Sequence, residues 1–249
     1  ATHSPYQAYF LGGSPDDSGI SIGSALHGAN QVLGHTTPRE AARHNYFGRE
    51  YTNDEIRAEL DRRKLRYTTS GDPAETGARL LAEGKILGWF QGAGEFGQRA
   101  LGNRSILADP TRPEMKDAVN ASVKYREGFR PFAPSILADR QSEVLELPDG
   151  QSSHFMEKVF PIQPAWRPKI PAVVHFDGTG RPQTVLSGSN ARYHELITAF
   201  EKQRGVPLVL NTSFNVNGMP MVESPADALD CFYQCGLDAL VLGDFLLEK

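Results

Sequence analysis

The chain has 249 residues, of which 39% are hydrophobic, and a formal net charge of -4. This length allows a substantial buried core, in one large domain or in one domain plus a fragment. The acidic charge argues against a general nucleic-acid binder, and the sequence contains no apolar run long enough to cross a membrane. The two cysteines, Cys231 and Cys235, lack the Cys/His partners of a zinc pattern, so we expect buried thiols in a cytoplasmic protein.

The first 34 residues are interpreted as the end of another domain. An acidic turn at 15–19 precedes a small-residue helix predicted from Ile20 to about Leu33. Such a helix needs close packing partners, and the neighbouring sequence supplies none. We therefore expect the C-terminal part of a longer protein, divided into the tail of an N-terminal domain (1–34), a linker region (35–70) and a separate domain (71–249).

Two capped helices come next, and an irregular alternation of short strands and helices follows them. The first helix is predicted at 53–60, and the second begins at Asp72 and ends at Gly84. Strands are predicted at 85–90, 105–108, 133–138, 170–176, 183–187, 206–210 and 238–242. Helices are predicted at 113–123, 139–146, 191–204 and 225–235, the first with a capping box from Thr111 to Glu114 and with Pro113 in its first turn. This order favours a mixed α/β or α+β sheet over strict βαβ repetition.

A glycine-rich segment, 92–105, follows the predicted strand at 85–90. It contains a G-x-G-x-x-G pattern, which in a dinucleotide-binding site must open a helix. Here the chain instead reaches Gly102 and then the short apolar run 105–108. We interpret the segment as a loop followed by a strand, with Arg99 and Arg104 available to grip an anion.

A basic segment lies at 124–134. If it is extended, Lys124, Arg126 and Arg130 project from one side. Between residues 99 and 130, seven Lys and Arg stand against four Asp and Glu, which indicates a small anionic ligand. A solvated basic surface is the alternative, although the interleaved Phe129 and Phe132 argue against it.

A polar segment follows the predicted strand at 206–210. Its side chains could hydrogen-bond phosphate, ribose or a planar carbamoyl group: Asn211, Thr212, Ser213 and Asn215. An ordinary Asx or Ser turn is the alternative. Arg181, before the strand at 183–187, could reach the same pocket or could be a surface residue.

Together, segments 94–107, 124–134 and 211–215 closely resemble the C-terminal region of O-carbamoyltransferases, a family of antibiotic-tailoring and nodulation-type enzymes. The resemblance extends from about Lys85 to Leu242. It implies a YrdC-like domain, which is a twisted mixed sheet with flanking helices. Such a domain would make carbamoyl-adenylate from carbamoyl phosphate and ATP with Mg²⁺. The carbamoyl group would then pass to a hydroxyl of a small-molecule acceptor, as in antibiotic biosynthesis. Lys124-x-Arg126 and Ser213-x-Asn215 look like the K-x-R and S-x-N signatures of threonylcarbamoyl-AMP synthases.

The resemblance also implies residue roles. Arg99, Lys124 and Arg130 would act in catalysis as electrostatic clamps on two polyanions. Binding of ATP and carbamoyl phosphate would involve Arg104, Arg126, Arg181, Asn211, Thr212, Ser213 and Asn215.

Segment 15–26 looks like the last block of an N-terminal ASKHA-type transferase domain that holds an iron-type metal. Asp17 fits a metal ligand, with Asp16 a lesser candidate, and the family's His-x-x-x-His pair does not occur among the seven histidines. We therefore expect the metal and the transfer step only in the complete two-domain enzyme.

Two other classes remain open. A threonylcarbamoyl-AMP synthase for tRNA modification would use bicarbonate and threonine, and the long loop with Arg99 favours the carbamoyltransferase over it. A non-catalytic nucleotide- or RNA-binding module is the second alternative, and the acidic net charge weighs against RNA.

Overall fold

The architecture is centred on an eight-stranded sheet in the order β1-β10-β9-β2-β3-β8-β4-β7. A computed structural model describes residues 11–36, 43–148 and 150–249. The strands of the sheet are β1 (Thr68–Thr69), β2 (Leu87–Phe90), β3 (Arg104–Ala108), β4 (Ala133–Leu137), β7 (Gln183–Val185), β8 (Leu208–Ser213), β9 (Ala239–Leu242) and β10 (Phe245–Glu248). Because β2 pairs parallel with β9, β4 pairs parallel with β7 and the other neighbours pair antiparallel, the sheet is mixed, as predicted. A separate ribbon pairs β5 (Phe160–Pro161) with β6 (Thr179–Gly180).

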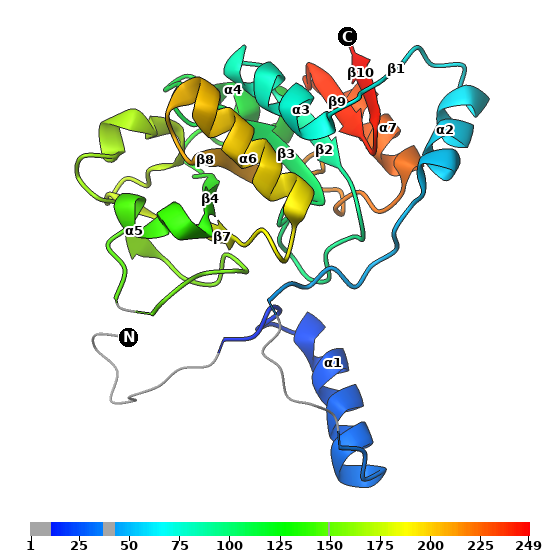
Figure 1. Cartoon of the computed structure of the whole chain (residues 1–249), viewed down its shortest axis with the longest axis vertical. Helices are drawn as coiled ribbons and strands as arrows, with labels where there is room; N and C mark the ends of the chain where they lie inside the picture. The colour runs from blue at the N-terminus through cyan, green and yellow to red at the C-terminus, as the bar shows by residue number, and fades with distance from the viewer. Residues whose placement is uncertain (1–10, 37–42, 149) are drawn as a thin grey trace.

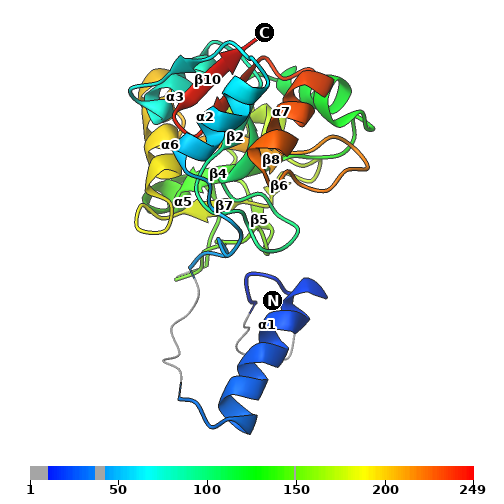
Figure 2. The same cartoon turned by 90° about the vertical axis from the view of Figure 1, so that its right-hand side faces the viewer.

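Helices cover both faces of the sheet (Figures 1 and 2). The helices are α1 (Ser18–His27), α2 (Asn53–Arg62), α3 (Pro73–Ala82), α4 (Met115–Val119), α5 (Gln141–Val144), α6 (Ala191–Arg204) and α7 (Pro225–Gln234). Short π or 3-10 turns are η1 (Gly28–Val32), η2 (Asn120–Lys124), η3 (Ala138–Arg140), η4 (Arg167–Lys169) and η5 (Pro171–Val173). Helices α3 and α6 pack together on one face, and α7 lies on the other. No helix in the described ranges has both the length and the apolar character needed to span a membrane.

Side-chain caps explain where the main helices begin. Thr52 and Glu55 form a capping box at α2, and Ser224 and Asp227 form one at α7. Asn190 accepts from the Tyr193 amide at the start of α6. The structure confirms the helices predicted at 53–60, 191–204 and 225–235. They could be predicted because their capping residues act locally.

The core is centred on strands that are buried along their whole length. β2, β3 and β4 are buried at every position, and Trp89, Leu107 and Ile136 are fully enclosed. Burying one such large side chain contributes roughly 1.5–3 kcal/mol relative to leaving it exposed. The core also takes Ile56 and Leu60 from α2, and β1 joins the sheet edge, so elements before residue 71 belong to the same folded body.

Two local predictions are wrong. Residues 170–176 form no strand, because Pro171 fixes its own φ and lacks an amide donor, and the segment makes the 3-10 turn η5 instead. Ile170 and Val173 are nevertheless buried, so the apolar run predicted burial but not conformation. The capping box at Thr111 does not form, because the Thr111 hydroxyl donates to the buried Asp109 carboxylate at 2.7 Å.

Helix α1 confirms the predicted small-residue helix, and it stands apart from the sheet (Figures 1 and 2). None of its residues is buried, and Ile20 is 63% exposed. The segment before it contacts the body, since the Ser14 hydroxyl donates to the Phe96 carbonyl at 3.1 Å.

Candidate functional site

A basic pocket of about 110 Å³ lies where the loop after β2, the segment before β4 and the end of β8 meet. It is lined by Gln98, Arg99, Ala100, Arg126, Pro131, Phe132, Ala133, Met156, Arg181, Asn211, Thr212 and Ser213. Six predicted ligand-binding or catalytic residues are therefore brought together from four separate segments. Among these described lining residues there is no Asp or Glu.

The three guanidinium groups of the basic pocket have few acidic neighbours: Glu127 acts on Arg126 and Asp16 acts on Arg99. Burial lowers the pKa of Arg126 and of Arg181, and a second arginine adds to each shift, Arg130 for Arg126 and Arg99 for Arg181. Arg126 donates to Asn120 Oδ1 at 2.7 Å, but within the described part of the chain no hydrogen bond or ion pair reaches Arg99 or Arg181. A bound anion would relieve this repulsion, and arginine forks suit phosphate oxygens.

Asn211 is the most buried polar residue of the pocket, with 1% of its surface exposed. Its Nδ2 donates to the Ala100 carbonyl at 3.1 Å and to Ser135 Oγ at 2.9 Å, which assigns the amide orientation. Its Oδ1 is buried and has no hydrogen-bond partner among the described residues. Such an atom is costly to leave unpaired, so it can accept from an N–H of a ligand.

Lys124 lies behind the pocket and does not line it. Its Nζ donates to the Ser213 carbonyl at 2.5 Å and to Asn215 Oδ1 at 2.7 Å, and it also contacts Ser213 Oγ and the Asn215 carbonyl. Burial, with a smaller effect of Arg126, lowers the pKa of Lys124 to about 7. In this geometry Lys124 holds Ser213 and Asn215 in place.

Residues 124–130 are not extended, so the condition under which Lys124, Arg126 and Arg130 would project from one side is not met. The helical turn η2 continues to Lys124, and Tyr125 then adopts the left-handed region at φ 46°. Lys124 consequently points inward and Arg126 reaches the pocket. Arg130 is half exposed, pairs with Glu127 at 3.1 Å, and is not brought to the pocket.

Arg104 is also placed elsewhere. It is 1% exposed, and its Nη1 donates to the Gln91 carbonyl at 2.7 Å while its Nη2 donates to the Arg49 carbonyl at 3.1 Å. Its guanidinium lies 3.6 Å from the centre of the Phe90 ring. The structure thus uses Arg104 to tie loop segments together rather than to line the basic pocket.

The glycine-rich segment is a loop followed by strand β3, as predicted. Gly102 has φ +105°, and a Cβ there would lie 2.2 Å from the Tyr193 ring, so glycine is required for backbone and packing reasons alike. Met156 also lines the pocket, at φ 56°, and its segment carried no motif that indicated this position.

Asp17 is exposed at the start of α1 and does not line the basic pocket. The described residues contain no group of three or more His, Cys, Asp or Glu side chains placed to hold a metal ion. A role for Asp17 as one ligand of a shared metal site stays a prediction.

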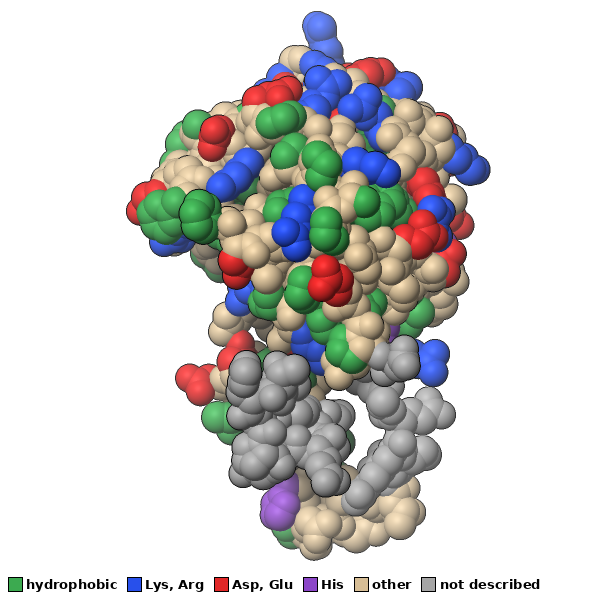
Figure 3. All heavy atoms as spheres, turned by 90° about the vertical axis from the view of Figure 1, so that its left-hand side faces the viewer, with side chains coloured by type: hydrophobic (Ala, Val, Ile, Leu, Met, Phe, Trp, Pro, Cys, Tyr) green, Lys and Arg blue, Asp and Glu red, His purple; other side chains and the backbone are tan. Residues whose placement is uncertain are grey.

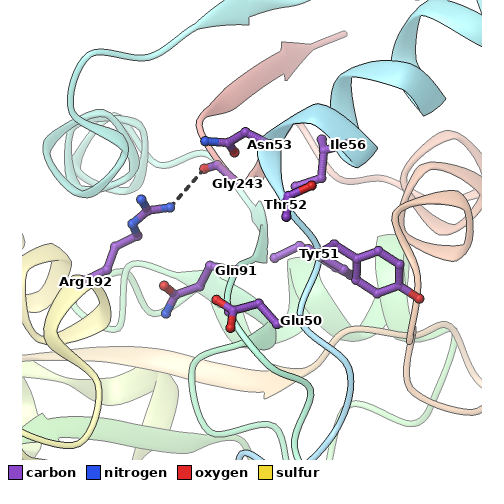
Figure 4. A pocket seen from close by; sticks show the side chains of 10 residues that line it. Glu50, Tyr51, Thr52, Asn53, Ile56, Gln91, Arg192 and Gly243 are labelled. Atoms are coloured by element: carbon purple, nitrogen blue, oxygen red, sulfur yellow. Dashed lines mark hydrogen bonds between the residues drawn. The ribbon is translucent and has the colours of Figure 1, made fainter.

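A larger pocket of about 390 Å³ lies beside the start of α2 (Figure 4). Arg192, which lines this pocket, already has partners for its guanidinium group. Its Nη2 lies 2.9 Å from Asp244 Oδ1, and its Nη1 donates to the Gly243 carbonyl at 3.4 Å. Glu50 adds a negative charge to the lining. This pocket is therefore less suited to a polyanion than the smaller basic pocket.

Figure 3 shows the face that lies on the left of Figure 1. On the described part of this face, Lys and Arg side chains are scattered among hydrophobic and uncharged ones and form no continuous basic surface. This arrangement is unlike the electrostatic footprint of a long nucleic acid.

The mixed sheet with flanking helices is a YrdC-like fold. The structure resembles a crystal structure of P. abyssi Sua5 complexed with L-threonine, with a TM-score of 0.50 over 69% of this chain and 46% of that chain. At 17% identity this similarity shows the fold alone.

The chain belongs to the carbamoyltransferase family, since the family described as "Carbamoyltransferase C-terminus" matches residues 78–249. It is 44% identical to "Nodulation protein NolNO" of Sinorhizobium fredii over 98% of this chain, and 43% identical to "Nodulation protein NolO" of Bradyrhizobium diazoefficiens over 96%. The chain spans 36% and 44% of the lengths of these two relatives. The family resemblance read from the sequence is thereby confirmed.

Proposed function

We propose that this chain is the carbamoyl-activating part of an O-carbamoyltransferase and forms carbamoyl-adenylate in the basic pocket. Carbamoyl phosphate and water would give carbamate and phosphate. A carbamate oxygen would then attack the α-phosphorus of ATP and expel pyrophosphate. The observation that carries the proposal is the convergence of Arg99, Arg126 and Arg181 in a pocket whose described lining has no carboxylate.

The arginines have a clear physical task in this reaction. Two polyanions must approach each other, and charge shifts onto pyrophosphate as it leaves. Fixed guanidinium groups offset both effects without reorganising during the reaction. The unpaired Oδ1 of Asn211 supports a carbamoyl ligand, because a carbamoyl group carries N–H donors and a phosphate does not.

The pocket is too small for a whole nucleotide, but it adjoins a groove of about 460 Å³ with which it shares Pro131. Two largely exposed aromatic side chains, Phe129 and Phe176, line that groove. We propose that the phosphates occupy the basic pocket and the adenosine lies along these aromatic rings.

Mg²⁺ is expected on the triphosphate, but the described lining of the basic pocket offers it no carboxylate ligand. Phosphate oxygens and water can supply its coordination. We assign no residue of this chain to it. Transfer to a small-molecule hydroxyl, and the iron-type metal that would serve it, are proposed for an N-terminal domain outside this chain.

The test is pyrophosphate release by the purified chain with ATP and Mg²⁺. Release that depends on carbamoyl phosphate supports the proposal. Equal release with bicarbonate plus threonine would move the chain to threonylcarbamoyl-AMP synthesis. No ATP binding by calorimetry at millimolar nucleotide would exclude both reactions and favour a role without nucleotide.

A further inference from the structure

The loop between β2 and β3 is closed around one carboxylate. Glu95 Oε1 accepts from the amides of Leu101 at 2.7 Å, Asn103 at 2.8 Å and Arg104 at 3.3 Å. Its Oε2 is buried and has no hydrogen-bond partner among the described residues. A carboxylate is costly to bury, and three converging amides offset part of that cost.

The closed segment carries Arg99. It is pinned at Glu95 and at Leu101, and Arg99 lies between these two points. The neighbouring carbonyls are held too: that of Ala100 accepts from Asn211 Nδ2, and that of Leu101 accepts from Gln183 Nε2 at 2.7 Å. Arg99 is thus an exposed side chain on a backbone whose next two residues, Ala100 and Leu101, are held by hydrogen bonds.

We infer that Glu95 is a positioning residue for the basic pocket: by gathering the amides of Leu101, Asn103 and Arg104, its carboxylate sets the backbone from which Arg99 reaches the ligand. This inference rests on the proposed function, because it assigns Arg99 to the bound phosphates. Glu95 itself does not line the pocket and touches no reacting atom. Its effect on the reaction is therefore expected to pass through Arg99.

The first measurement is hydrogen exchange at the three amides, which needs no ligand. Glu95→Ala should speed exchange at Leu101, Asn103 and Arg104 by at least about tenfold, the scale of hydrogen bonds to a charged group. Glu95→Gln keeps one acceptor oxygen and should fall between the alanine variant and the wild type. Glu195→Gln, an exposed glutamate on α6, is the matched control and should leave these amides unchanged. Unchanged exchange in Glu95→Ala would overturn the inference.

The second measurement is a double-mutant cycle on ATP binding and carbamoyl phosphate-dependent pyrophosphate release. Glu95→Ala and Arg99→Ala should each weaken ATP binding by about tenfold or more, and the double variant should be little worse than Arg99→Ala alone. Additive losses would show that Glu95 acts independently of Arg99 and would contradict the inference.

The two proposals fail differently. If the wild-type chain neither binds ATP nor releases pyrophosphate, the proposed function fails, and the role of Glu95 in positioning Arg99 toward a ligand fails with it. The hydrogen-exchange data would still decide whether Glu95 holds the loop. If the wild type is active and Glu95→Ala matches it in binding and release, only the inference about Glu95 is wrong.

Discussion

The ammonium of Lys124 donates to the backbone carbonyl of Ser213 at 2.5 Å and thereby joins the end of η2 to the end of β8. The contact lies beneath Ser213, which lines the basic pocket, and it connects two segments that the sequence showed as separate motifs. Because the lysine is buried, its charge state depends on pH in a way that can be measured.

We predict a pH-dependent stability that Lys124→Met abolishes. Burial lowers the pKa of Lys124 from 10.5 to about 7. Between these values the unfolded chain binds a proton that the folded chain does not, so stability should rise with pH from about 7 to about 10.5. The difference in unfolding free energy between wild type and Lys124→Met, from urea titrations at several pH values, should follow this rise. The exposed Lys202→Met serves as control. Parallel pH profiles for wild type and Lys124→Met would contradict the prediction.

Arg99 and Arg130 should behave differently, although both were predicted to be catalytic. Arg99→Ala should slow carbamoyl phosphate-dependent pyrophosphate release. The activation free energy should rise by about 2–4 kcal/mol, as expected for the loss of one electrostatic donor. Arg130→Ala should change it little, because Arg130 is outside the pocket lining and pairs with Glu127. Steady-state kinetics give both values, and thermal unfolding checks that each variant is folded. A larger loss in Arg130→Ala than in Arg99→Ala would reverse the assignment.

Arg104→Met should destabilise the fold. The substitution removes the donors to the Gln91 and Arg49 carbonyls. The Arg49 carbonyl keeps the Gly94 amide as a donor, so the Gln91 carbonyl is the acceptor left unpaired, at a cost of about 1–3 kcal/mol. Arg104→Lys should recover only part of this, because an ammonium cannot reproduce the planar fork. Denaturant unfolding measures both variants. Wild-type stability in Arg104→Met would show that these contacts contribute nothing.

The sequence predicted the loop after β2, most helices and the mixed sheet, because glycines, caps and apolar runs act locally. It also indicated six pocket residues, since each belongs to a polar or basic motif at the end of an element. It could not predict that Lys124 is buried while Arg126 reaches the pocket, because the left-handed residue between them is Tyr125 and not a glycine. Nor could it separate Arg99 from Arg104, because whether an arginine meets solvent or backbone carbonyls is decided by distant segments such as 49 and 91.

The last prediction separates activation from transfer in the full-length protein. The Asp17 side chain is exposed and its carboxylate accepts no hydrogen bond from other described residues, whereas the Asp16 carboxylate already accepts from the amide and the hydroxyl of Ser18. Those hydrogen bonds keep the pKa of Asp16 below its usual value. We therefore predict that Asp17, rather than Asp16, contributes a carboxylate to a metal ligated mainly by the N-terminal domain, because one carboxylate alone would hold a transition metal weakly.

Asp17→Ala in the full-length protein should keep carbamoyl phosphate-dependent pyrophosphate release, because Asp17 does not line the basic pocket. It should lose carbamoylation of the acceptor hydroxyl and bind less metal by elemental analysis. Asp16→Asn tests the lesser candidate: it retains an acceptor for Ser18 and should keep wild-type metal content and transfer. Full transfer by Asp17→Ala with wild-type metal content would remove Asp17 from the site. Loss of pyrophosphate release as well would mean that α1 supports the activating domain itself.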